Sequence, residues 1–301
     1  MRNTLLILTG PTGVGKTELS LTIAEQFHSP IISADSRQLY KDLPIGTAAP
    51  TPEQQERVKH YMVGTLELQD YYSAAMFEAD SLNLLSELFK IHPVVVMSGG
   101  SMMYVDALCN GIDEIPTIPQ DTRNELYQLY EREGLEPILE ELKEVDPEHY
   151  EKVDRQNYKR VIHAVEVCRT AGQPYSTLRT NTPKQRPFNI VKIGLIRERE
   201  ELYARINKRV DEMINAGLQE EARRVYTFKN FNSLNTVGFK EFFLYFDGDV
   251  TLDAAIEKIK RNTRMYARKQ MTWFRRDTGI TWFKPDDVTG VLLYIQTILD
   301  N

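Results

Sequence analysis

The clearest indication of chemistry is a short run near the start of the chain. Residues 10–17 read Gly-Pro-Thr-Gly-Val-Gly-Lys-Thr, which matches the phosphate-binding loop pattern of Gly, four residues, Gly-Lys and Ser or Thr. Glycines let backbone N–H groups converge on anionic oxygens, and the N-terminus of a following helix adds partial positive charge. We therefore predict a polyphosphate site formed by Gly10, Pro11, Thr12, Gly13, Val14, Gly15, Lys16 and Thr17.

Within this loop, two side chains have separate expected roles. Lys16 places a point charge on a terminal phosphate, and the Thr17 hydroxyl is a ligand for Mg²⁺. Because such a loop contacts only phosphates, it does not indicate which group the phosphates carry.

A second polar group, Asp35-Ser36-Arg37-Gln38, follows the apolar run Ile31–Ser33. A carboxylate at Asp35 has three possible roles: a Mg²⁺ ligand, a general base, or a turn aspartate that caps a helix. Arg37 is either a contact to an anion or nucleic acid, or a partner in a surface salt bridge. The residues alone leave these alternatives open.

A third polar group, Ser98-Gly99-Gly100-Ser101, follows the apolar run Val94–Met97. Many phosphate-loop NTPases have a Mg²⁺-binding Asp at the end of such a strand, and this chain does not. The two glycines permit close approach of a ligand to the backbone, and Ser101 offers a hydroxyl to bind it. The set of residues that such enzymes use for nucleotide hydrolysis is therefore incomplete in this chain.

These three polar groups need a scaffold that brings them together. Short apolar runs at Leu5–Leu8, Ile31–Ser33 and Val94–Met97 alternate with helical stretches, which is typical of a parallel sheet wrapped by helices. Ligands of open α/β sheets bind beyond the carboxyl ends of the strands. We predict an α/β fold with a phosphate-loop core, whose three polar segments face one crevice.

The composition changes at the proline-punctuated connector Ile115–Pro119. The stretch that follows is helical and charged, which predicts an all-helical insertion domain at 120–186 between two parts of the core, 1–119 and 187–301. After the insertion we expect a strand and then helices at Ile190–Ile196, Glu200–Ala216, Leu218–Phe228, Lys240–Phe246 and Leu252–Arg275.

The composition is that of a globular protein, with 42% hydrophobic and 27% charged residues in 301. No apolar stretch approaches the ~18 residues that cross a bilayer, so no membrane partner is expected. The two cysteines, Cys109 and Cys168, are far apart and fit free thiols in a reducing compartment. We expect a cytoplasmic monomer.

The charge is unevenly distributed. A net charge of −6 argues against general nucleic-acid binding, yet 258–276 contains eight Lys and Arg and no Asp or Glu. A basic stripe on an acidic protein suits one specific polyanion, although such a helix is often just a solvated face.

Motifs along the whole chain resemble those of the tRNA dimethylallyltransferases, the bacterial tRNA isopentenyltransferases. The phosphate loop alone is common to many proteins, whereas Asp-Ser-Arg-Gln-x-Tyr joined to Ile-Gly-Thr-Ala and a terminal Lys-Gln-x-Thr-Trp-Phe-Arg is specific. The matching segments are Gly10–Thr17, Asp35–Tyr40, Ile45–Pro50, Tyr72–Ala75, Gly99–Tyr104, Glu144–Pro147, Leu202–Asp211, Val237–Glu241 and Thr263–Arg275.

The resemblance implies that a dimethylallyl group passes from dimethylallyl diphosphate to the exocyclic N6 amine of the adenosine 3′ of the anticodon in tRNA, with Mg²⁺ as cofactor. It implies Asp35 as the general base, with Lys16, Thr12 and Arg209 as further catalytic residues. Arg205, four residues before Arg209 on the same helix face, is a weaker candidate.

The resemblance also implies which residues contact the anticodon stem-loop, whose target base must leave its stack to react. Lys159 and His163 depart from the usual Gln-Arg-x-x-Arg pattern of one contact segment, and Ser101 replaces the usual Thr. The implied contacts are Asp35, Ser36, Arg37, Gln38, Ser101, Arg123, Lys159, Arg160, Val161, Ile162 and His163.

On the basic C-terminal helix, spacing places Arg261, Arg264 and Arg268 on one face that can follow a phosphate backbone, whereas Tyr266, Trp273 and Phe274 are expected to pack into the core. Two other functions share parts of this pattern: a small-molecule or nucleoside kinase, and a phosphate-loop RNA-binding module without catalysis.

Overall fold

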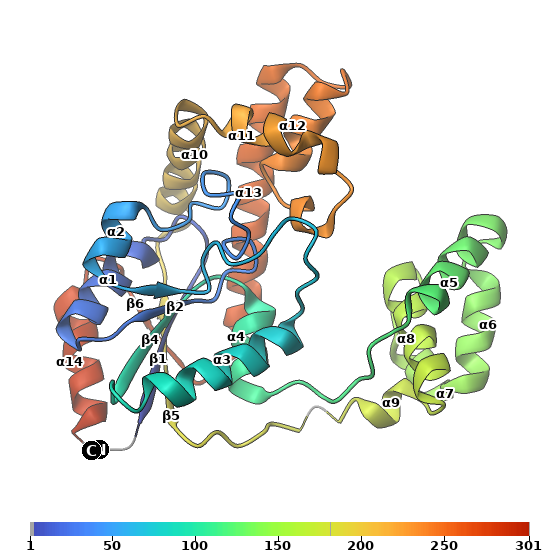
Figure 1. The fold of residues 1–301 in the computed structure, drawn as a ribbon, viewed down its shortest axis with the longest axis horizontal. Coiled ribbons are helices and arrows are strands. Elements are labelled where there is room, and N and C mark those ends of the chain that lie inside the picture. Colours follow the sequence, from blue (N-terminus) through green and yellow to red (C-terminus); the bar gives the residue numbers. More distant parts are fainter. Residues whose placement is uncertain (1–2, 181, 301) are drawn as a thin grey trace. The chain divides into compact units, whose positions relative to one another are not determined.

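The computed structural model describes residues 3–180 and 182–300. The chain forms two compact units: unit 1 lies within residues 1–109 and 185–301, and unit 2 within 110–184. Unit 1 contains all six strands and most of the helices, whereas the described residues of unit 2 contain only helices and loops (Figure 1).

The centre of unit 1 is a parallel sheet of six strands in the order β3-β2-β4-β1-β5-β6. This confirms the predicted α/β class, but the short strands β3 and β6 were not predicted. The strands are β1 Thr4–Thr9, β2 Ile31–Ser33, β3 His60–Tyr61, β4 Val94–Ser98, β5 Asn189–Leu195 and β6 Ile280–Phe283.

Helices cover both faces of the sheet. Side chains alternate along a strand, so Leu5 and Ile7 of β1 enter one hydrophobic cluster with α3 and α4, while Leu6 and Leu8 enter another with α1 and α14. The helices of unit 1 are α1 Lys16–Gln26, α2 Pro52–Arg57, α3 Ala74–Leu88, α4 Met102–Asn110, α10 Arg199–Asn215, α11 Leu218–Val225, α12 Phe239–Phe246, α13 Leu252–Phe274 and α14 Val288–Leu299.

Unit 2 has its own core, formed where α5, α6 and α8 pack together. Its limits differ from the predicted 120–186. Ile115 and Ile118 of the connector pack against this core, whereas Arg186 donates to the backbone oxygen of Leu108 in unit 1. The helices are α5 Gln120–Glu133, α6 Glu136–Val145, α7 Pro147–Lys152, α8 Tyr158–Ala171 and α9 Tyr175–Leu178.

In the described ranges, every helix is too short or too polar to cross a membrane.

Candidate functional site

The predicted phosphate loop joins the end of β1 to the start of α1. Gly10 and Gly13 have φ angles of 141° and 78°, in the range that favours glycine. A Cβ at Gly10 would lie 2.8 Å from the backbone oxygen of Leu195, and one at Gly13 would lie 2.9 Å from the Ile206 side chain. The loop path therefore depends on glycine for both its dihedral angles and its close packing.

Lys16 lies in the first turn of α1, and its side chain folds back over the loop. Its Nζ donates to the backbone oxygens of Gly10 at 2.9 Å and Pro11 at 3.0 Å. Burial, with the charge of Arg209, lowers the pKa of the Lys16 ammonium to about 7, and Asp35 acts in the opposite direction. An anion bound in the loop would favour the charged form of Lys16.

Two arginines from outside the loop hold its backbone oxygens. The Arg197 Nε donates to the oxygen of Val14 at 2.9 Å, and the Arg205 Nε donates to that of Gly13 at 3.0 Å. Arg205, predicted as a weaker diphosphate candidate, thus fixes the loop itself.

Gln270 of α13 connects the loop to the end of β4. Its Oε1 accepts from the Thr12 N–H at 2.9 Å, and its Nε2 donates to the backbone oxygen of Gly100 at 2.8 Å. The side chain is 2% exposed. The sequence analysis includes Gln270 only within a motif and assigns it no role, because Thr12 and Gly100 are distant from it in the sequence.

Asp35 lies directly after β2, in a tight turn. Its Oδ1 accepts from the backbone N–H groups of Arg37 at 2.9 Å and Gln38 at 3.4 Å. This is the hydrogen bonding of a turn aspartate, and Asp35 also lines the cleft beside the loop. The turn therefore presents the carboxylate to the cleft, so the role of a turn aspartate does not exclude that of a general base or a Mg²⁺ ligand.

The Ser-Gly-Gly-Ser segment supports this turn. The Ser101 Oγ accepts from the Ser36 N–H at 2.8 Å, and Ser101 is 7% exposed. A Cβ at Gly99 would lie 2.2 Å from the backbone oxygen of Ala34. This glycine therefore permits close packing of β4 against the Asp35 turn, and it also lines the hollow that contains the phosphate loop, where a ligand could approach its backbone.

Arg37 and Gln38 also bond within unit 1. The Arg37 Nη1 donates to the backbone oxygens of Asn232 at 2.9 Å and Ser233 at 3.3 Å. Gln38 accepts from the Ser33 hydroxyl and donates to the backbone oxygen of Ala48 at 3.0 Å. Both side chains therefore fix the loops around Asp35.

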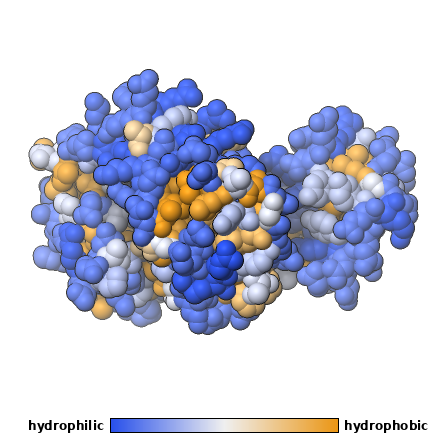
Figure 2. Space-filling view, turned by 90° about the horizontal axis from the view of Figure 1, so that it is seen from above, coloured by the Kyte–Doolittle hydropathy of each residue, from blue (hydrophilic) through white to orange (hydrophobic). Residues whose placement is uncertain are grey.

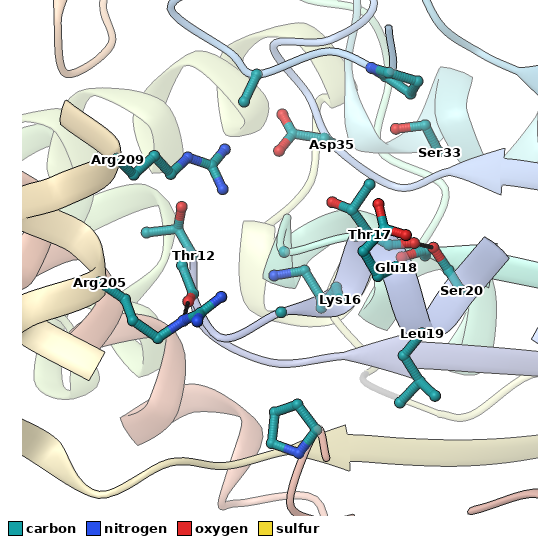
Figure 3. A pocket seen from close by; sticks show the side chains of 18 of the residues that line it. Thr12, Lys16, Thr17, Glu18, Leu19, Ser20, Ser33, Asp35, Arg205 and Arg209 are labelled. Atoms are coloured by element: carbon teal, nitrogen blue, oxygen red, sulfur yellow. Dashed lines mark hydrogen bonds between the residues drawn. The ribbon is translucent and has the colours of Figure 1, made fainter. Parts of the chain in front are cut away.

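Two hollows of unit 1 meet at one wall. The first, of about 630 Å³, contains the phosphate loop, and the second, of about 440 Å³, extends along α13. Both are lined by Thr12, Asp35, Thr47, Arg209 and Tyr266. Figure 3 shows Thr12 and Lys16 of the phosphate loop around a common space with Asp35, which follows β2, and Arg209 of α10.

Arg209 reaches this wall from α10. Burial lowers the pKa of its guanidinium, and the charge of Asp35 acts in the opposite direction. Cations at Lys16 and Arg209 with the carboxylate of Asp35 make a site that can hold a polyanion beside a proton acceptor.

A metal would rely on few protein ligands here. The described residues contain no group of three or more His, Cys, Asp or Glu that could hold a metal ion. Thr17 is exposed at the start of α1 and lines the first hollow. This fits Mg²⁺, which commonly keeps several waters and binds through one or two side chains plus the phosphates of a substrate.

The predicted contact segment of unit 2 divides into two kinds of residue. Lys159 and Arg160 are exposed in the first turn of α8, where the helix dipole adds to their positive charge. Val161 and Ile162 are at most 1% exposed and pack in the core of unit 2. Their side chains cannot reach a ligand, so the prediction is corrected for these two.

Glu166 organises two further predicted contacts in unit 2. This buried carboxylate lies 3.2 Å from the Arg123 Nε and 3.6 Å from the His163 Nδ1. Arg123 thus lies in an ion pair, and part of its charge is already balanced.

The residues of α13 follow the prediction only in part. Arg261 and Arg268 are exposed, whereas Arg264 donates to the Asn207 side chain at 2.6 Å. Phe274 is buried as predicted. Tyr266 and Trp273 are corrections: Tyr266 is 37% exposed and lines both hollows, and Trp273 is partly exposed beneath the Arg276 guanidinium.

Comparisons with known proteins agree along the chain. Residues 38–277 match the family described as IPP transferase. The chain is 68% identical over 294 residues to tRNA dimethylallyltransferase 2 of Parabacteroides distasonis, covering 98% of each.

Two solved structures have the same fold. The full-length tRNA isopentenylpyrophosphate transferase of Bacillus halodurans matches with a TM-score of 0.73 at 33% identity, covering 99% of this chain and 97% of that one. A eukaryotic dimethylallyltransferase acting on tRNA matches with a TM-score of 0.78 at 25% identity, covering 90% of this chain and 69% of that one.

Proposed function

This chain belongs to the IPP transferase family, and we propose that it transfers the dimethylallyl group of dimethylallyl diphosphate to the N6 amine of the adenosine 3′ of the anticodon in tRNA. The observation that carries the proposal is the wall of Thr12, Asp35 and Arg209 between two hollows. One hollow contains the phosphate loop, and the other leaves room for the acceptor.

The phosphate loop binds the leaving group in this proposal. Lys16 and Arg209 balance the charge that develops on the diphosphate as the carbon–oxygen bond breaks. Arg197, Arg205 and Gln270 hold the loop before any ligand binds, so little reorganisation is needed in the reaction. The diphosphate is released, and no water has to be activated for hydrolysis.

Asp35 takes the proton that the amine must lose. A bond forms between N6 and the first carbon of the dimethylallyl group, the bond from that carbon to the diphosphate oxygen breaks, and the N6 proton passes to the Asp35 carboxylate. Because the turn bonds of Asp35 are made through Oδ1, they fix the carboxylate in place for this role.

Thr12 completes the wall between diphosphate and amine. Its backbone N–H donates to the Gln270 Oε1, which fixes the backbone position. Thr12 lines both hollows. We assign its hydroxyl a contact to the leaving oxygen or to the amine.

We propose Mg²⁺ as cofactor, which Thr17 would hold together with diphosphate oxygens and waters. When bound, the ion neutralises charge on the leaving group. Thr17 is exposed at the start of α1 and lines the hollow of the phosphate loop, which supports this arrangement.

For the tRNA, the exposed cations of unit 2 and α13 supply contacts to phosphates. Lys159 and Arg160 in unit 2, and Arg261 and Arg268 on α13, are suited to the anticodon stem-loop backbone. Such contacts orient the RNA, and the selection of the base depends on the hollows beside Asp35.

We also propose a monomer that acts in the cytoplasm. Cys109 and Cys168 are buried free thiols, as expected in a reducing compartment. Light scattering during size-exclusion chromatography checks the first point, since a dimer would double the mass.

The test of the function is product analysis. Purified protein is incubated with dimethylallyl diphosphate, Mg²⁺ and an unmodified tRNA, and the nucleosides are analysed by mass spectrometry. We expect N6-dimethylallyladenosine, and none when guanosine replaces the adenosine beside the anticodon. ATP consumption without that product would instead support a kinase, and RNA binding without turnover a non-catalytic module.

A further inference from the structure

Two phenylalanines between α11 and α12 are exposed and stacked on each other. Phe228 is 45% exposed and Phe231 is 36% exposed, with ring centroids 5.5 Å apart and planes 20° apart. Figure 2 shows hydrophobic side chains gathered among hydrophilic ones over the end of unit 1 that carries α11 and α12. We call residues 226–238 the aromatic segment. Its paired rings are partly buried, and their remaining exposed surface is apolar.

The aromatic segment is attached to the candidate site. Arg37, two residues from Asp35, donates to the backbone oxygens of Asn232 and Ser233 within it. A hydrogen bond of 3.1 Å from the Leu234 N–H to the Phe231 oxygen keeps the segment compact. Its residues Asn235 to Gly238 line the second hollow together with Arg37 and Asp35. The rings therefore belong to a segment that borders the acceptor side of the site.

The charge around the rings suits a polyanion. Residues 222–240 contain Arg223, Arg224, Lys229 and Lys240 and no Asp or Glu. Lys229 pairs with Asp247, and Arg223 lies over the Phe246 ring, while Arg224 and Lys240 are exposed. Exposed aromatic rings among cations are the combination by which proteins bind single-stranded nucleic acid.

We propose that Phe228 and Phe231 form a stacking platform for an unpaired base of the tRNA loop, next to the base that enters the site. This rests on the proposed function and adds a contact to the acceptor. Unpaired loop bases expose flat faces that stack on aromatic side chains, and nearby arginine and lysine bind the phosphates. A stacked neighbour would also keep the loop in place while the target base is out of its stack.

The test uses an anticodon stem-loop RNA with fluorescent 2-aminopurine at a loop position next to the target adenosine. Binding of the wild-type protein is expected to change the 2-aminopurine fluorescence, because stacking alters the emission of this base. In the Phe228→Ala/Phe231→Ala variant we expect that change to be lost and KM for the stem-loop to rise about 10-fold. The kcat and the KM for dimethylallyl diphosphate should stay within two-fold.

Two controls separate stacking from other effects. Phe231→Leu keeps an apolar side chain but no ring, so it should weaken RNA binding although it fits the same space. Leu293→Ala removes a more exposed apolar side chain on α14, which is 64% exposed, and should change neither the fluorescence response nor the KM for the stem-loop. Thermal unfolding of each variant shows whether the protein is folded.

The outcomes separate this inference from the proposed function. Wild-type transfer to the stem-loop, with unchanged KM and fluorescence in the folded double variant, would overturn the platform and leave the proposed function standing. A surface that docks another protein would give that same result. A fluorescence change that depends on both rings, without any transfer, would support the platform and overturn the proposed reaction.

Discussion

The phosphate loop and the cationic face of unit 2 are built in opposite ways. The loop is held by Arg197, Arg205 and Gln270, whose partners are backbone groups of the loop itself. On unit 2, Lys159 and Arg160 project from the start of α8 and are exposed. One region is fixed before a ligand arrives, and the other depends on side chains that remain free to adjust.

The two regions differ because bond breaking and RNA binding need different kinds of interaction. Bond breaking requires charges placed within fractions of an ångström, so the loop is preorganised. Phosphate contacts to a long RNA tolerate several geometries and act mainly through charge. Substitutions at the first region should therefore change the rate, and those at the second should change binding of tRNA.

The largest effect is expected at Asp35. Asp35→Ala should lower kcat about 100-fold or more, because the general base is lost, while tRNA binding stays nearly unchanged. Single-turnover rates and a filter-binding assay measure the two quantities.

Asp35→Asn is the matched control for Asp35→Ala. It can still accept the turn hydrogen bonds through Oδ1 but does not act as a base, so it should be as slow as the alanine variant. A parallel loss of binding and rate in both variants would instead make Asp35 a positioning residue.

Gln270→Ala should have the next largest effect, lowering kcat about 10-fold. It removes the link from α13 to the loop and leaves the partly buried Thr12 N–H and the buried Gly100 oxygen without this partner. The loss costs about 1–3 kcal/mol for the buried oxygen and less for the Thr12 N–H. The melting temperature should therefore fall as well. A variant with a lowered melting temperature but an unchanged rate would show that the loop does not need this support.

The pKa of Lys16 predicts a pH dependence of diphosphate binding. Its folded pKa of about 7 lies below the ordinary 10.5, so the free protein loses this charge as the pH rises through 7. Binding of an anion favours the charged form, and above pH 7 it must therefore take up a proton.

Affinity for diphosphate without Mg²⁺ should thus fall about five-fold between pH 7 and pH 8, beyond the change due to the ligand's own ionisation. Calorimetry in buffers with different ionisation enthalpies counts the protons taken up. Lys16→Arg stays charged over this range and should lack the uptake. Equal proton uptake by both proteins would remove Lys16 as its source.

The smallest effect is expected on unit 2. Arg160→Ala should raise KM for tRNA about three-fold without changing kcat. The slope of log affinity against log salt concentration should fall by about one, because one phosphate contact is lost. Val161→Ala is the contrasting neighbour: its side chain is buried, so it should lower the melting temperature instead. If Arg160→Ala slowed the chemical step as Asp35→Ala does, the division between the two regions would be wrong.

Local patterns in the sequence were enough to predict much of the fold and part of the site. The phosphate loop has a fixed residue spacing, and the strands around it are uniform apolar runs. Both features can therefore be predicted from the sequence. Strand β3 has only two residues and β6 lies at the sheet edge with partly exposed side chains, and neither gives a clear apolar run.

The contacts that fix the site join residues far apart in the chain. Gln270 meets Thr12, and Gly99 meets Ala34, in ways that no local spacing indicates. Val161 and Ile162 show the reverse case, in which a motif implied contact for a whole segment although a helix turns only some of its residues outward.

In the proposed reaction, the loop holds a phosphate group that is discarded while the carbon group is kept. The most direct measurement uses dimethylallyl diphosphate labelled with ¹⁴C in the carbon group and ³²P in the diphosphate, with unmodified tRNA and Mg²⁺. We predict that ¹⁴C appears in the tRNA and ³²P as free diphosphate in equal amounts, and that Asp35→Ala reduces both together. Transfer of ³²P to the RNA, or no ¹⁴C in the RNA from folded protein, would rule out this reaction.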